Sequence, residues 1–171
     1  MNNTRHEVVR VDPKELPGDS KLFGIPWRII VIVGIILSAS LGCKALGVPW
    51  TFITQLGKVM FISEASSLLV GSLTSCIGLL KRSSRLVLFG GSLILLNVCI
   101  STSLAVMMSI GSYGELIWSE RLKKQHVEDF LEFRGYNALS SSLAGIAIIV
   151  YSSKLKKTNQ GNFRRANLDQ G

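Results

Sequence analysis

The chain has 171 residues, of which 47% are hydrophobic, and a formal net charge of +8. Four apolar runs long enough to cross a bilayer occupy most of this length, which excludes a separate soluble domain. The basic residues collect at the ends of these runs, where the positive-inside bias accounts for them, so the charge does not indicate a nucleic-acid partner. We therefore expect an all-α membrane protein that forms a single bundle of four transmembrane helices.

The N-terminal segment and the first apolar run have different compositions. Residues 1–24 are polar, contain Pro13 and Pro17 and show no apolar period, which predicts a flexible tail. The first span is expected over about 25–46. Arg28 and Lys44 then lie near the two interfaces and extend outward along their aliphatic stems.

The second span is expected over about 52–80, and it carries two charged residues, Lys58 and Glu64. At about 100° per residue, small and polar side chains fall on one side of this helix and large aliphatic side chains on the other. Small residues four positions apart let neighbouring backbones approach closely, so we expect the first side to be a helix–helix seam. This side consists of Gly57, Met60, Glu64, Ser67, Gly71, Ser75 and Gly78.

The third span follows a short turn, Lys81 to Arg85, whose three basic residues predict a cytoplasmic position. The span itself is expected over about 86–110 and contains no charged residue. Asn97 falls near its middle. An amide at that depth should face protein rather than acyl chains.

The last part of the chain is expected to hold an outer loop, a fourth span and a basic tail. Residues 112–135 combine charged and aromatic side chains, which predicts either a short amphipathic helix at the membrane surface or a helical extension of the third span. The fourth span, about 136–153, repeats the close-packing spacing at Ser141 and Gly145. Residues 154–171 are expected to form a basic tail that could touch anionic lipid.

The distribution of positive charge predicts the orientation. Of the 19 Lys and Arg residues, thirteen lie in the N-terminal segment up to Arg28, the turn after the second span and the C-terminal tail. We therefore expect both termini to be cytoplasmic and the loop 112–135 to be extracellular or lumenal. Which membrane holds the protein, the plasma membrane or part of the endomembrane system, is left open by the sequence.

Glu64 is the strongest candidate for a functional residue, because placing an ionised carboxylate in hydrocarbon costs free energy. One interpretation makes it a proton or cation site, with Asn97 as a deeper polar partner. The alternative places Glu64 near the outer interface, protonated or neutralised by Lys44 or Lys58, where it specifies helix pairing. The sequence favours the second interpretation because no other acid and no histidine falls within the expected spans.

Signatures of catalysis and of cofactor or metal binding are missing from the sequence. There is no Cys-x-x-Cys pair, no His-Glu-x-x-His, no Gly-x-Ser-x-Gly and no phosphate-binding glycine loop. His126 has neighbouring carboxylates but no second well-spaced histidine or cysteine, a weak metal signal. Cys43, Cys76 and Cys99 fall inside expected spans and are expected to be small packing residues. We expect no enzyme activity, no cofactor and no metal.

Two resemblances can be drawn once the spans are placed. In length, loop pattern and expected cytoplasmic termini, the chain resembles the MARVEL-type proteins of vesicle traffic and junctions. A weaker resemblance to Jagunal-type proteins of the endoplasmic reticulum involves Lys44, Gly78-Leu79-Leu80 before the basic turn, and Tyr151-Ser152-Ser153-Lys154-Leu155. Both resemblances imply a non-enzymatic role in membrane organisation or trafficking.

The sequence therefore leaves two alternative hypotheses about function. The favoured one is a membrane organiser or adaptor whose partners are the bilayer and other membrane proteins or further copies of itself. It predicts that Gly71→Leu or Gly145→Leu disrupts assembly, whereas Glu64→Gln is tolerated. The alternative is a small carrier or channel subunit in which Glu64 and Asn97 line a proton or cation path.

Overall fold

The computed structural model describes residues 21–22, 24–47, 53–110 and 124–168, without the side chains of residues 21, 108, 124–127 and 161–168. Within these ranges lie two short strands and four helices, and each helix contains a stretch long and apolar enough to cross a membrane. The strands, β1 (Lys21–Leu22) and β2 (Ile25–Pro26), pair antiparallel just before the first helix. The helices are α1 (Trp27–Leu46), α2 (Gln55–Leu80), α3 (Ser84–Ser109) and α5 (Lys124–Leu168).

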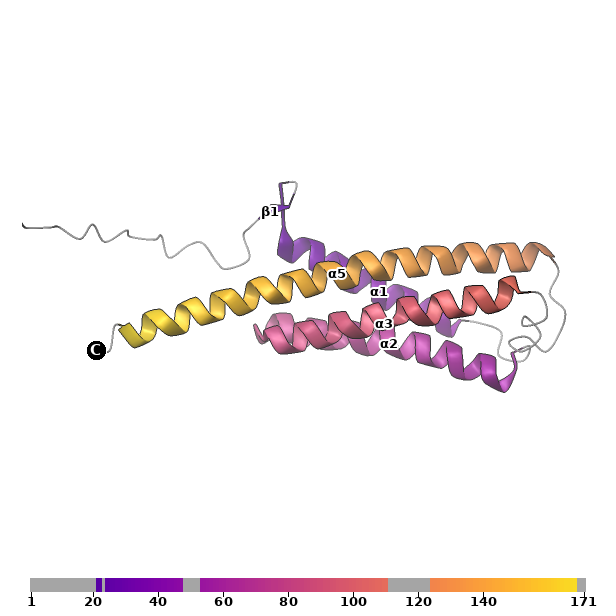
Figure 1. The fold of residues 1–171 in the computed structure, drawn as a ribbon, viewed down its shortest axis with the longest axis horizontal. Helices are drawn as coiled ribbons and strands as arrows, with labels where there is room; N and C mark the ends of the chain where they lie inside the picture. Colours follow the sequence, from indigo (N-terminus) through magenta and orange to yellow (C-terminus); the bar gives the residue numbers. More distant parts are fainter. Residues whose placement is uncertain (1–20, 23, 48–52, 111–123, 169–171) are drawn as a thin grey trace, which may run out of the picture.

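The four helices form a bundle in which each helix packs mainly against two neighbours, in the cyclic order α1, α2, α3, α5. In Figure 1 the start of α1, the α2–α3 turn and the C-terminal part of α5 lie toward the same end of the bundle. We call this the turn end. The opposite end, where α1 finishes and α5 begins, is called the loop end.

The boundaries of α2 follow from local capping. The Thr54 hydroxyl accepts a hydrogen bond from the Gly57 N–H at 3.1 Å, so it caps the first turn. At the other end, Ser83 N–H donates to Gly78 O and Arg82 N–H to Leu79 O, which is the Schellman pattern. Arg82 occupies the left-handed position of this motif with φ 50°, where glycine is the usual residue. These bonds reverse the chain within three residues.

The last helix differs most from the sequence-based expectation. Residues 124–135 were expected to belong to the outer loop and residues 154–168 to a tail, but all of them are part of α5. From Lys124 onward, the chain therefore forms neither a separate surface helix nor an extension of α3, but extends the fourth apolar helix at its N-terminal end. Residues 112–123 lie outside the described part of the chain. The charges in this segment suggested a loop, yet the buried side is continuous along the helix.

The other boundaries differ by only a few residues. Helix α1 begins at Trp27, because Ile25 and Pro26 belong to β2. Helix α2 begins at Gln55 rather than near 52, and α3 covers Ser84–Ser109 rather than 86–110. Of the expected N-terminal tail, residues 1–20 and 23 lie outside the described part of the chain.

The interior of the bundle is divided into three zones along its length. An apolar cluster at the turn end includes Val31, Leu68, Val87 and Ile148. A smaller apolar cluster at the loop end contains Ile53, Phe61 and Leu104. Fully buried polar residues of α2, α3 and α5 lie between the two clusters. The polar part of the interior therefore has apolar side chains on both sides along the bundle.

Close backbone approach brings α2, α3 and α5 together. An added Cβ at Gly71 would lie 2.9 Å from Gly90 O, and one at Gly90 would lie 2.6 Å from Gly71 O. At Gly145 the added atom would lie 2.6 Å from Leu95 Cγ. Glycine is therefore required at these contacts for steric reasons.

We predict opposite effects for two Gly→Ala substitutions. Gly90→Ala puts a methyl group against the α2 backbone and should lower the free energy of unfolding by about 1–3 kcal/mol. Gly135→Ala, on an exposed part of α5 where an added Cβ meets nothing within 4 Å, should raise it by up to about 1 kcal/mol. Reversible unfolding in detergent micelles measures both. Equal responses would show that the close approach of α2 and α3 does not limit stability.

Candidate functional site

The polar zone of the interior is organised around an ion pair between two helices. Glu64 of α2 is 0% exposed, and its Oε2 accepts a hydrogen bond from Nη1 of Arg134 of α5, which is 2% exposed. The two residues are 70 positions apart in the chain. A buried carboxylate is stable only with a partner of opposite charge and further hydrogen bonds, and Arg134 supplies the charge.

The second oxygen of the Glu64 carboxylate receives two more donors. Ser101 Oγ of α3 donates to Oε1 at 2.7 Å, and Asn137 Nδ2 of α5 also donates to Oε1. The Asn137 amide lies 3.0 Å from Ser101 Oγ as well. The carboxylate therefore connects three helices through charge-assisted hydrogen bonds, which are stronger than neutral ones.

The network continues deeper along α3 and α5. Asn97 Nδ2 donates to Ser141 Oγ at 2.9 Å and lies 3.2 Å from Asn137 Oδ1. Asn137 therefore joins the ion pair to Asn97, which is fully buried. The two polar residues that the sequence singled out, Glu64 and Asn97, therefore belong to one network and are joined through Asn137.

Aromatic rings surround the Arg134 guanidinium on the side toward the loop end. Its Cζ lies 4.8 Å from the ring centroid of Phe61, 4.6 Å from that of Phe130 and 5.4 Å from that of Phe133. Phe61 and Phe130 pack edge to face with their centroids 6.1 Å apart. Cation–π contacts of this kind stabilise a guanidinium that has lost its water.

The charge balance of Glu64 differs from the sequence-based expectation. Glu64 was expected to be protonated or to be neutralised by Lys44 or Lys58, but the buried cation beside it is Arg134. Lys44 is exposed at the end of α1, with its Nζ 4.5 Å from the Phe133 ring centroid. Arg134 was assigned to the outer loop because of the charges around it.

A sequence signal for the missed residues exists in the spacing of α5. Arg134, Asn137 and Ser141 occupy positions i, i+3 and i+7, and this series continues through Ala144, Ile148 and Leu155 as the buried side of the helix. Extending the Ser141 side toward the N-terminus would have included Arg134 and Asn137. Ser101 shares the Asn97 side of α3 by the same spacing.

The remaining candidate residues lie on the buried sides of α2 and α5. Ser67 bonds to its own helix, through Oγ to Glu64 O at 2.8 Å. Gly71 and Ser75 face α3, where an added Cβ at Gly90 would meet the Ser75 backbone. Gly145 faces α3 at Leu95 and Gly91. These residues contribute to helix contact, whereas Glu64, Asn97 and Ser141 belong to the polar network.

Some buried polar atoms of the described residues have no hydrogen-bond partner. In the network these are Asn97 Oδ1 and Arg134 Nε; elsewhere they are the hydroxyls of Ser38, Ser72 and Ser75. Each such atom carries a desolvation cost of roughly 1–3 kcal/mol.

The cysteines of the described residues, and their potential metal ligands other than Glu64, lie apart from the polar network. No group of three His, Cys, Asp or Glu in that part of the chain is arranged to hold a metal ion. Cys43, Cys76 and Cys99 are free and exposed on the outside of the bundle. The sequence predicted small packing residues, and in the structure these three side chains do not pack in the interior of the bundle.

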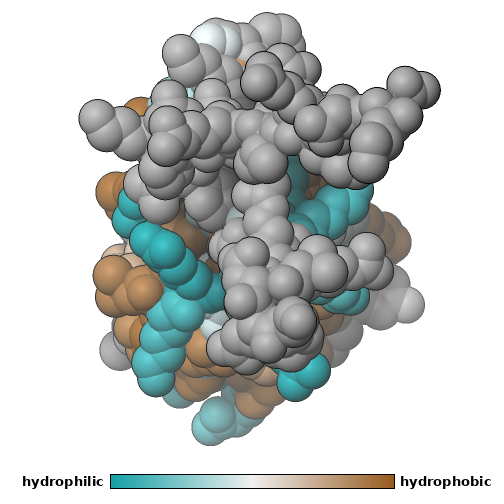
Figure 2. Space-filling view, turned by 90° about the vertical axis from the view of Figure 1, so that its left-hand side faces the viewer, coloured by the Kyte–Doolittle hydropathy of each residue, from teal (hydrophilic) through white to brown (hydrophobic). Residues whose placement is uncertain are grey.

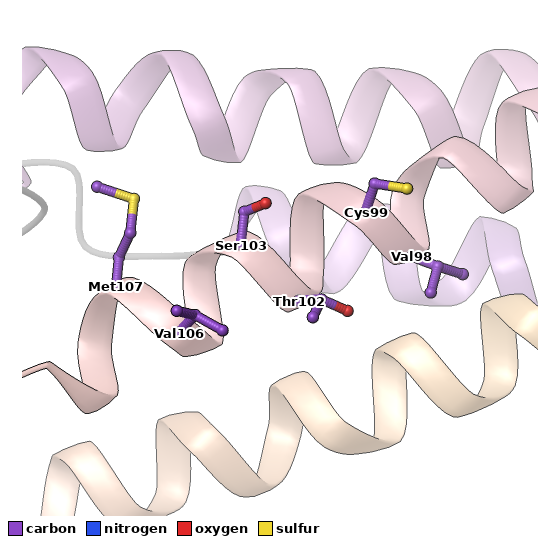
Figure 3. A pocket seen from close by; sticks show the side chains of 6 residues that line it. All are labelled: Val98, Cys99, Thr102, Ser103, Val106 and Met107. Carbon is purple, nitrogen blue, oxygen red and sulfur yellow. The ribbon is translucent and has the colours of Figure 1, made fainter.

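A groove lies on the outer surface of α3, separate from the polar network. Its volume is about 570 Å³, and it is lined by Val98, Cys99, Thr102, Ser103, Val106 and Met107. Figure 3 shows these six side chains projecting from the one helix. The lining contains no Asp, Glu, Lys, Arg or His, so the groove offers mainly uncharged contact surface.

Comparison with known protein families, with curated proteins and with solved structures finds no match to this chain. The MARVEL-type and Jagunal-type resemblances therefore stay expectations from the sequence. The interpretation of the site depends on its own geometry.

The ion pair predicts strong coupling between Glu64 and Arg134. Arg134→Leu alone leaves a buried carboxylate without its cation and should lower the free energy of unfolding by about 3–5 kcal/mol. Adding Glu64→Leu should restore much of this loss, because apolar residues of similar size often replace a buried pair at little cost. A double-mutant cycle by unfolding in detergent measures the coupling. Additive single effects would contradict the pairing.

The two amides should differ in importance. Asn137→Leu removes a donor to Glu64 and contacts with Ser101, Asn97 and Ser141, and should cost about 1–3 kcal/mol. Asn97→Leu removes contacts only at the edge of the network, with a cost of roughly 0.6 kcal/mol per hydrogen bond. The same unfolding measurement ranks them. A larger loss for Asn97→Leu would place the centre of the network elsewhere.

Proposed function

We propose that this protein is a non-enzymatic, multi-pass membrane organiser or adaptor, with both termini on the cytoplasmic side. The observation that carries the proposal is the closed polar network around Glu64. Its carboxylate already has a cation, Arg134, and two further donors, Ser101 and Asn137, and apolar clusters lie on either side of it. A site arranged in this way stabilises the bundle and presents no free reactive group to a substrate.

The outer surface of the bundle supports the same proposal. Large aliphatic side chains on the outside of the helices are exposed, for example Val59, Leu73 and Leu143. In a bilayer this surface contacts acyl chains or the helices of other membrane proteins. The uncharged groove on α3 adds a concave region to it. The expected partners are the bilayer and other membrane proteins or further copies of the chain.

A small carrier or channel subunit is the second candidate. The observation in its favour is the presence of unpartnered buried atoms, Asn97 Oδ1 and Arg134 Nε, beside a carboxylate. Transport through this region would require the Glu64–Arg134 pair to separate and the aromatic side chains at the loop end to move. A carrier that opens in this way needs Glu64 itself, whereas an organiser needs only an intact bundle.

One experiment separates the two functions. Glu64→Gln is unsuitable as the test variant, since it leaves the Arg134 cation buried without its counter-charge. The double variant Glu64→Leu/Arg134→Leu removes the pair together. We expect wild-type proteoliposomes to show no proton or cation flux above empty vesicles, and we expect the double variant to keep the wild-type set of neighbours in proximity labelling of the native cell.

Flux in wild-type vesicles that disappears in the double variant would overturn the organiser proposal in favour of the carrier. The Gly90→Ala variant provides the control for bundle integrity, because it loosens the α2–α3 contact without touching a charge. For an organiser, this variant should lose neighbours while the charge-free double variant keeps them.

A further inference from the structure

We propose that the turn end of the bundle is a docking surface for anionic lipid headgroups. The surface, called the basic collar, combines exposed or partly exposed basic residues from α1, from the α2–α3 turn and the start of α3, and from α5. Its members are Arg28, Lys81, Arg82, Arg85, Lys154, Lys156 and Lys157. The proposal requires that the helices span a bilayer, and it does not depend on the organiser function.

The charge of the collar has one sign. The described ranges 24–34, 72–94 and 146–160 contain Lys and Arg but no Asp or Glu. Figure 2 looks at this end of the molecule and shows several hydrophilic patches interspersed with hydrophobic residues. Four to eight basic residues immediately beside a transmembrane helix are typical of binding to anionic lipids.

Specific contacts bring the parts of the collar together. Asn159 Nδ2 of α5 donates to Arg82 O of the α2–α3 turn at 3.2 Å. On another side of α5, Lys154 Nζ lies 4.5 Å from the ring centroid of Trp27 at the start of α1. The basic residues of three segments therefore belong to one surface that the fold places together.

The length of α5 places this surface at headgroup depth. The span-like part of α5, Glu128–Gln160, has 33 residues, or about 50 Å of helix, against roughly 30 Å of hydrocarbon. From Arg134 to Lys154 the helix rises about 30 Å, so with Arg134 just inside one face of the hydrocarbon, Lys154 reaches the other face. Lys156 and Lys157 then lie among the phosphate groups, and the α2–α3 turn, which contacts Asn159 of α5, lies at the same end of the bundle (Figure 1).

A lipid fits the collar better than an acidic protein. The basic groups surround the helix ends in the plane where lipid phosphates lie, and the Trp27 ring beside Lys154 is the kind of side chain that anchors at this interface. Each Lys or Arg near an anionic surface adds an increment of binding that salt screens. Binding should therefore depend on lipid charge and weaken as ionic strength rises.

The test measures lipid retention by the full-length, detergent-purified protein in native mass spectrometry. The probes are phosphatidylserine, phosphatidylinositol bisphosphate and phosphatidylcholine. We expect the wild type to bind the two anionic lipids roughly tenfold or more tightly than phosphatidylcholine. Lys156→Gln/Lys157→Gln should lose most of this preference. The matched variant Lys44→Gln/Lys58→Gln, which removes two lysines away from the collar, should keep it.

Arg82→Gly is a second variant that separates binding from folding. Glycine adopts the φ of 50° at this position without strain, so the turn should not be destabilised. Because one collar charge is removed, the preference for anionic over neutral lipid should fall by roughly fivefold. Equal retention of neutral and anionic lipid by the wild type would overturn the proposal. Equal losses in the two lysine-pair variants would do so as well, and tighter binding of polyglutamate than of anionic lipid would indicate a protein partner instead.

Discussion

The structure depends on the need to neutralise one carboxylate inside the bundle. Glu64 lies fully buried on α2, and isolated charges are not tolerated in such surroundings. Arg134 neutralises it from α5, while Ser101 and Asn137 supply donors from α3 and α5. This requirement fixes the register of three helices at one level, because no nearby residue on α5 offers the same side chain.

The same requirement explains the unusual start of α5. A segment containing Glu128, Asp129 and Glu132 has little reason to join an apolar bundle, and all three of these side chains are largely or fully outside the core. Arg134 lies on the opposite side of the helix, toward Glu64 and the phenylalanine rings. The ion pair and its aromatic surroundings therefore draw a charged segment into contact with α2.

The three zones of the interior give the bundle different kinds of specificity. At the turn end, close approach of glycines and interlocking aliphatic side chains determine how near α2 and α3 come. In the polar zone, hydrogen bonds determine which residues lie opposite one another. Packing alone tolerates exchanges of similar apolar residues, whereas a buried polar network penalises a shifted register. These interior contacts leave the outer surface of the helices exposed.

The sequence by itself determined the number of helices long and apolar enough to cross a membrane, their approximate positions and the side of α2 that faces inward. Apolar length and helical periodicity are local properties. It also singled out Glu64 and Asn97 as intramembrane polar residues. Only the tertiary structure decided that Arg134 balances Glu64, that Asn137 joins Glu64 to Asn97, and that α5 extends from Lys124 to Leu168. A charged residue such as Arg134 resembles a loop residue when only its neighbours in the sequence are considered. Its partner, Glu64, is 70 positions away in the chain, and a local sequence pattern cannot identify a pairing over that separation.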